Sequence, residues 1–239
     1  MWERSELKQK GKAAFKSNYW KCVLVSLILA LIACAQGSST STTTSSDDTA
    51  YETESVTGII EDTADEAGIS TAAVASIILS VILVACLISF LIEILVKNIF
   101  KVGCVKFYID NADSPAGLGD LISGFKNGFG RNVITMLLVD VCVALWSLLL
   151  VVPGIIKAYE YLMVPYIIAD DAEISRKDAF AKSKEMMKGN KWKTFVLQLS
   201  FIGWGILSVI TCGLVGIFYA NPYADATMAE LYLTLKENA

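Results

Sequence analysis

Apolar runs long enough to cross a bilayer alternate with basic segments along this chain, and this alternation restricts its fold more than any other feature. A membrane-spanning helix needs about 20 consecutive, predominantly apolar residues. Residues 69–96 form a run of 28 residues in which Glu93 is the one charged side chain. Charged residues make up 18% of the chain, whereas an ordinary globular domain has about 25%. The sequence therefore predicts an all-α, polytopic membrane protein.

The distribution of Lys and Arg predicts which segments face the cytoplasm. Nineteen of these 20 residues lie at the N-terminus, between 97 and 131, between 176 and 193, or at the C-terminus, and Lys157 is the exception. Cytoplasmic loops of membrane proteins carry an excess of positive charge. About six spans with both termini in the cytoplasm place all nineteen on that side. Five spans remain an alternative, because the turn expected at Gly213 is a weak signal. We expect a multi-pass protein of the cell membrane.

The expected segments form a single membrane domain, 1–239. In order, we expect a cytoplasmic surface helix at 1–21, span 1 at 22–35, an outer acidic loop rich in Ser and Thr at 36–68, span 2 at 69–96, a cytoplasmic segment at 97–131, span 3 at 132–152, span 4 at 155–169, a cytoplasmic amphipathic helix at 170–193, span 5 at 194–212 and span 6 at 214–235. The residues expected to form turns or kinks are Pro153, Gly154, Pro165 and Pro222.

A short motif recurs where apolar runs begin. Residues 16–21 read KSNYWK and residues 188–193 read KGNKWK, and each ends a basic segment. Residues 126–132 read KNGFGRN, a more degenerate version. We interpret the chain as three units, each a basic amphipathic surface helix followed by a transmembrane hairpin. The alternative is that any point where a chain enters a membrane favours Lys and Trp.

The N-terminal segment has two interpretations. A basic start and a short apolar core also describe a secretory signal, and Leu31-Ile32-Ala33-Cys34 fits a lipoprotein processing site. Against this, Tyr19 and Trp20 are an aromatic pair typical of a membrane interface. The motif at 16–21 also recurs at 188–193, which a signal has no reason to copy. We predict that residues 1–33 remain in the mature protein.

Ionisable side chains inside a membrane are costly and mark a functional site by default. The candidate intramembrane polar site consists of Asp140, Lys157 and Glu160. Asp140 lies well inside span 3, where it is either functional or hydrogen-bonded to a neighbouring helix. Lys157 and Glu160 are three residues apart on one helix, so they either pair with each other or extend to the outer interface.

The basic helix before span 5 is a candidate for binding anionic lipid headgroups. A Lys or Arg near an anionic membrane surface contributes about 1 kcal/mol. The same residues are also what positive-inside sorting requires, so both interpretations stay open. Membrane lipid is the expected partner, and another membrane protein or self-association is a further candidate. The candidate headgroup contacts are Arg176, Lys177, Lys184, Lys188, Lys191 and Lys193.

Several functional classes lack their characteristic residues in this sequence. The chain has no histidine, which excludes His-based triads, proton relays and His metal ligands. Its six cysteines lie in or beside apolar runs without CxxC spacing, so we expect no metal site and no cofactor. There is no phosphate-binding loop or nucleophile elbow, and we expect no enzymatic activity. The basic residues do not form one continuous stripe, so nucleic acid is not an expected partner.

The most specific pattern in the chain lies between residues 152 and 204. It comprises Val152-Pro153-Gly154-Ile155-Ile156, Tyr159, Tyr161, Pro165-Tyr166, Ala169-Asp170-Asp171, Ser183, Met187-Lys188-Gly189, Lys191-Trp192-Lys193 and Leu199-Ser200-Phe201-Ile202-Gly203-Trp204. This pattern resembles the bacterial membrane family filed as domain of unknown function 975. The resemblance implies a multi-span protein of the cytoplasmic membrane, and no established activity comes with it.

The expected function is that of a non-enzymatic integral membrane protein of unknown molecular activity. It would serve as a membrane-organising or accessory subunit that contacts anionic lipid. The alternative is a small transporter or exporter component that uses Asp140, Lys157 and Glu160.

Overall fold

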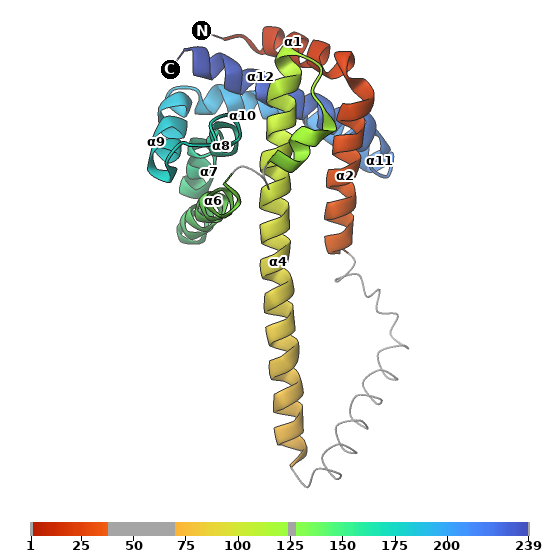
Figure 1. Ribbon diagram of the computed structural model, residues 1–239, viewed down its shortest axis with the longest axis vertical. Coiled ribbons are helices and arrows are strands. Elements are labelled where there is room, and N and C mark those ends of the chain that lie inside the picture. The colour runs from red at the N-terminus through yellow and green to blue at the C-terminus, as the bar shows by residue number, and fades with distance from the viewer. Residues whose placement is uncertain (1, 38–69, 124–127, 239) are drawn as a thin grey trace. The chain divides into compact units, whose positions relative to one another are not determined.

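The computed structural model describes residues 2–37, 70–123 and 128–238, and every regular element in these residues is helical (Figure 1). The all-α class is therefore confirmed for the described part of the chain. The acidic loop expected at 36–68 lies almost entirely outside it, so that expectation stays a prediction. The chain divides into two compact units, which we describe separately: residues 33–94, and residues 1–32 together with 95–239.

The described helices keep the numbering of Figure 1. They are α1 (Arg4–Ser17), α2 (Tyr19–Gly37), α4 (Thr71–Asp113), η1 (Leu118–Ile122), α6 (Phe129–Leu149), α7 (Val151–Glu160), α8 (Val164–Asp170), α9 (Arg176–Met187), α10 (Lys191–Leu199), α11 (Ile202–Ile210), η2 (Gly216–Ala220) and α12 (Asn221–Glu237). The unit of residues 33–94 contains the first part of α4, and the other unit contains the rest of α4.

Four helical segments of the described chain are long and apolar enough to cross a membrane: Ala72–Ser89, Phe129–Leu149, Val151–Asp170 and Lys191–Ile210. A fifth results if α1 and α2, which meet at 95°, are counted as one broken span. Helix α12 is not among these segments; it packs along α1. The described residues thus provide four or five candidate spans, and the six-span arrangement in three hairpins is not confirmed.

In the unit of residues 33–94, α4 exposes most of its apolar side chains. Ile77, Leu83 and Leu87 are each more than half exposed. A helix that is apolar over this length requires either protein cover or a hydrocarbon environment. This part of α4 is therefore suited to contact with lipid.

The helix break before α7 lies at Leu150, three residues before the expected turn at Pro153. Leu150 has an extended backbone, with φ −157° and ψ 135°. Pro153 lies in the first turn of α7, where proline is tolerated because its missing N–H would have no helical partner. Gly154 allows close packing instead of a turn, since a Cβ at this position would lie 2.6 Å from the Ser147 Cα. Residues 153–154 therefore bring α6 and α7 together.

Pro165 and Pro222 each occupy one of the first two positions of a helix, α8 and α12 respectively. Proline is favoured there because its φ angle is already helical. The same two helices are joined by Asp170, whose Oδ2 accepts a hydrogen bond from the Tyr232 hydroxyl at 2.7 Å. The Lys236 Nζ lies 2.6 Å from the same oxygen. Three groups thus connect the end of α8 to α12.

Helices α1 and α12 pack side by side, as Figure 1 shows. Leu7 and Phe15 on α1 and Leu231 on α12 are at most 2% exposed. The two backbones come very close at Gly11, where a Cβ would lie 2.7 Å from the Thr227 Cα. This packing fixes the N-terminal helix, and the residues just before it, against the C-terminal helix.

Candidate functional site

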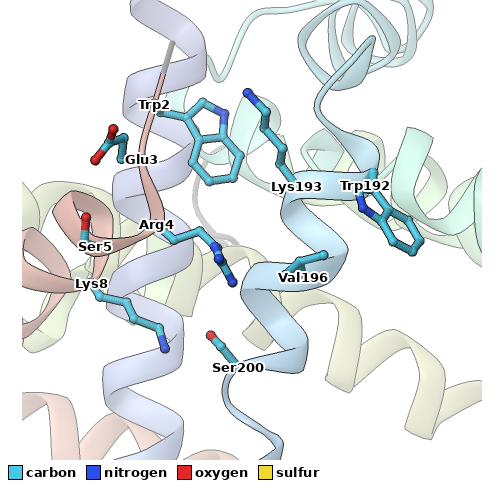
Figure 2. A pocket seen from close by; sticks show the side chains of 9 residues that line it. All are labelled: Trp2, Glu3, Arg4, Ser5, Lys8, Trp192, Lys193, Val196 and Ser200. Atoms are coloured by element: carbon cyan, nitrogen blue, oxygen red, sulfur yellow. The ribbon is translucent and has the colours of Figure 1, made fainter.

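A pocket of about 670 Å³ lies between the start of α1 and helix α10. We call it the basic pocket, because three of its side chains are cationic and one is acidic. Figure 2 shows the lining: Trp2, Glu3, Arg4, Ser5, Lys8, Trp192, Lys193, Val196 and Ser200. The pocket thus joins the first residues of the chain to a segment near its C-terminal end.

Trp2 is held in place by the turn between α9 and α10. Its indole Nε1 donates a hydrogen bond to the Asn190 Oδ1 at 3.1 Å, and 9% of its surface is exposed. Asn190 is itself held, because its Nδ2 donates to the Met186 carbonyl at 3.0 Å. The turn has a positive φ of 77° at Gly189, which glycine adopts without strain. The Lys-Gly-Asn turn therefore fixes one wall of the basic pocket.

Arg4 and Lys8 are four residues apart on α1, so they lie on the same face of the helix. Both side chains point towards α10 in Figure 2, whereas the Glu3 carboxylate points away. Burial lowers the pKa of Lys8, and the nearby Arg4 guanidinium lowers that pKa further. A bound anion would reverse the effect of Arg4, because an opposite charge favours the protonated amine.

The three cations of the basic pocket are not neutralised within the described structure. No ion pair between described residues involves Arg4, Lys8 or Lys193. Helix α1 begins at Arg4 without a side-chain cap, so its first N–H groups add to the positive potential. The pocket can therefore stabilise an anion by charge-assisted hydrogen bonds.

Aromatic rings position two of these cations. The Lys8 Nζ lies 4.7 Å from the centre of the Phe201 ring. The Lys193 Nζ lies 5.9 Å from the centre of the Trp2 ring. A cation over an aromatic face is attracted to it, which limits the freedom of the flexible lysine side chains.

The structure distributes the predicted headgroup contacts over three places. Lys193 lies in the basic pocket. The others divide between a second pocket of about 420 Å³, lined by Glu160, Lys184, Glu185, Lys188 and Lys191, and the exposed start of α9, where Arg176 and Lys177 lie. Two carboxylates in the second pocket offset most of its charge, so the basic pocket is the stronger anion site.

The predicted intramembrane polar site is divided into two groups. The Glu160 Oε2 lies 2.5 Å from the Lys157 Nζ, and its Oε1 lies 3.1 Å from the Lys191 Nζ. Asp140 has a different partner: its Oδ2 accepts a hydrogen bond from the Asn98 Nδ2 on α4 at 2.9 Å. No hydrogen bond or ion pair between described residues joins Asp140 to Lys157 or Glu160. The structure thus brings the lysine and the glutamate together but not the aspartate.

Two parts of the structure were missed by reasoning from the sequence. Trp2 was not singled out, and Arg4 and Lys8 were counted only among the basic residues of the expected surface helix at 1–21; an aromatic residue beside two cations one helical turn apart is a usable signal for an anion site. Asp225 was overlooked within the expected span 6. A carboxylate in such an apolar segment marks a candidate functional site.

Asp225 is half-buried on α12, and burial raises the pKa of its carboxyl to about 7, an effect that the Lys101 charge opposes. Lys101 also interacts electrostatically with Asp140. Burial, together with the charge of Asp225, raises the pKa of the Cys104 thiol to about 12. Asp225 thus lies near Lys101 and Cys104 of α4. Among the described residues, no group of three or more His, Cys, Asp or Glu is arranged to hold a metal ion.

Residues 147–239 match the family model described as "Protein of unknown function (DUF975)". This part of the chain is similar to that family. The match confirms the resemblance predicted from residues 152–204, and the DUF975 region contributes Trp192, Lys193, Val196 and Ser200 to the basic pocket. The residues that α1 contributes precede the matched region. No curated protein and no solved structure matches the chain at a significant level.

Proposed function

We propose that this chain is a non-enzymatic integral membrane protein that binds an anionic lipid headgroup in the basic pocket. Its role would be that of a membrane-organising or accessory subunit. The observation that carries the proposal is the convergence of Arg4, Lys8 and Lys193 on one pocket without a carboxylate partner among the described residues.

The position of the basic pocket along the chain supports a lipid ligand. Lys193 lies in the first turn of the candidate span Lys191–Ile210. The other wall of the pocket is the start of α1. This helix meets the apolar helix α2 at 95°, so the two helices run in different directions. The Lys193 wall of the pocket therefore lies where a basic segment gives way to an apolar one, which is the level of lipid headgroups.

The chemistry of the basic pocket suits a phosphodiester. Arg4 presents a planar guanidinium that can donate two parallel hydrogen bonds to phosphate oxygens, and the lysines act as point charges. The volume of about 670 Å³ lies within the usual range for small-molecule sites, roughly 300–1,000 Å³. The pocket therefore has room for a headgroup larger than a free phosphate ion.

The alternative, a small transporter or exporter component, has less support. It requires Asp140, Lys157 and Glu160 to act in one polar site. Lys157 and Glu160 pair with each other, whereas Asp140 pairs with Asn98. The Lys157–Glu160 pair lies within α7, and the Asp140–Asn98 hydrogen bond is a structural contact between two helices.

The proposal is tested by measuring lipid binding to the full-length protein in a detergent without charged headgroups. Native mass spectrometry would count bound phosphatidylglycerol and bound phosphatidylcholine separately. We expect the wild-type protein to retain phosphatidylglycerol preferentially. Arg4→Ala and Lys8→Ala should each weaken its binding about fivefold, because each removes about 1 kcal/mol of attraction.

Lys10→Ala is the matched control. Lys10 is on the same helix but pairs with Glu6 at 3.1 Å and does not line the basic pocket. This variant should bind phosphatidylglycerol as the wild type does. Equal losses in Lys10→Ala and Arg4→Ala would mean that binding depends only on surface charge, and the proposal would then be rejected. The absence of any preference for phosphatidylglycerol would reject it as well.

A further inference from the structure

A third pocket, which is apolar, lies between α7 and α10 and shares Trp192 with the basic pocket. Its volume is about 250 Å³, and we call it the apolar groove. It is lined by Val152, Ile155, Ile156, Tyr159, Lys191, Trp192 and Phe195. All of these residues belong to the candidate spans Val151–Asp170 and Lys191–Ile210.

Trp192 belongs to both pockets, and helix geometry explains why. Successive residues of an α-helix are separated by about 100° around its axis. Lys191 and Phe195 therefore lie on one face of α10, Lys193 and Val196 lie about 150° further round the helix, and Trp192 lies between the two faces. In Figure 2 the Trp192 side chain points away from Arg4 and Lys8, towards the side of α10 where the apolar groove lies.

The walls of the apolar groove are fixed by contacts between α7 and α10. The Tyr159 hydroxyl donates a hydrogen bond to the Gln198 Oε1 at 2.6 Å. The Phe195 ring packs against Tyr159 at 6.0 Å and against Trp192 at 5.3 Å between ring centres. The ion pair between Lys191 and Glu160 joins the same two helices. The groove is thus a built feature of the interface between α7 and α10.

We propose that the apolar groove holds one acyl chain of the anionic lipid whose headgroup occupies the basic pocket. This inference rests on the proposed function. The groove has the volume of about eight water molecules, which suits a segment of one chain and is far too small for a helix of about 10 Å diameter. Trp192 forms the boundary, since an indole ring suits a site with one apolar side and one polar side.

The test compares two ligands with the same headgroup on the full-length protein. One is dioleoylphosphatidylglycerol, and the other is glycerophosphoglycerol, which lacks the acyl chains. Ile156→Trp fills the apolar groove at a position that is half exposed, so the substitution leaves the fold intact. It should weaken binding of the lipid about fivefold through lost contacts with the chain, and leave binding of glycerophosphoglycerol unchanged.

Leu148→Trp is the matched control, because Leu148 is 86% exposed on α6 and does not line the groove. It should bind both ligands as the wild type does. If Ile156→Trp binds the lipid normally while Arg4→Ala weakens binding of both ligands, the acyl-chain site is overturned and the headgroup site stands. If Arg4→Ala changes the binding of neither ligand, the headgroup site fails and this inference fails with it.

Discussion

Replacing Gly11 by alanine should force α1 away from α12. The new Cβ would lie 2.7 Å from the Thr227 Cα and 2.8 Å from its backbone nitrogen. Non-bonded carbon atoms prefer separations of roughly 3.5–4.0 Å, so the helices must move apart by about 1 Å. The obstacle is backbone on both sides, and a change of side-chain rotamer cannot relieve it.

The loss of folding stability expected for Gly11→Ala follows from the side chains that α1 and α12 bury against each other. Leu7 and Phe15 are 2% and 1% exposed, and burial of each side chain stabilises a fold by about 1.5–3 kcal/mol. A gap of this size removes roughly a quarter to a half of the dispersion attraction across it. Two side chains together then lose about 1–3 kcal/mol, which matches the usual cost of overpacking a core.

Thermal unfolding of the purified protein in detergent provides the measurement, with Gly205→Ala as the control. Gly205 lies within α11, and a Cβ there has no atom within 4 Å. Both substitutions gain about 1 kcal/mol of helix propensity, so their difference isolates the packing cost. In a chain of this size, each kcal/mol shifts the unfolding midpoint by about 2–4 °C.

We expect Gly11→Ala to unfold at a clearly lower temperature than Gly205→Ala. It should also bind phosphatidylglycerol more weakly, because α1 carries Arg4 and Lys8. Equal midpoints for the two variants would refute the close packing of α1 on α12, and with it the placement of the N-terminal wall of the basic pocket.

Three further predictions follow from individual contacts. Glu160→Gln removes the carboxylate partner of Lys191 and should destabilise the protein by about 1–3 kcal/mol in thermal unfolding; an unchanged midpoint would show that these charges are solvated. Tyr232→Phe removes the 2.7 Å hydrogen bond to Asp170 and should cost about 1–2 kcal/mol in the same assay, with no loss of lipid binding. Asp225 should make stability fall as the pH rises between its ordinary pKa of 3.8 and its raised pKa of about 7, because over that range the native protein keeps a proton that the unfolded chain has lost. Unfolding midpoints measured across this pH range should therefore decline in the wild type and decline less in Asp225→Asn. If the midpoint falls equally with pH in both proteins, the raised pKa of Asp225 is contradicted.

The sequence by itself determined the helical class, the presence of several segments apolar enough to cross a membrane, and the likeness of the C-terminal region to its family. These properties depend on local patterns: an apolar run of sufficient length predicts a helix that can cross a bilayer wherever it occurs. The motif pattern at 152–204 likewise identified the family that the model at 147–239 matches. The sixth span expected at 214–235 is not among the candidate spans of the described residues, and α12, which forms most of that segment, packs along α1.

Only the tertiary structure decided which residues meet. Trp2 and Asn190 are 188 positions apart, and no periodicity links them; their hydrogen bond exists because the fold places the residue before α1 beside the turn between α9 and α10. The same packing brings Lys193 into one pocket with the N-terminal cations. Asp140 pairs with Asn98 for a similar reason, since Asn98 is buried and a buried polar group takes the partner that folding places beside it. Hydropathy and charge are local properties of a chain, whereas a binding site depends on contacts between distant segments, and those are set by the packing of the helices.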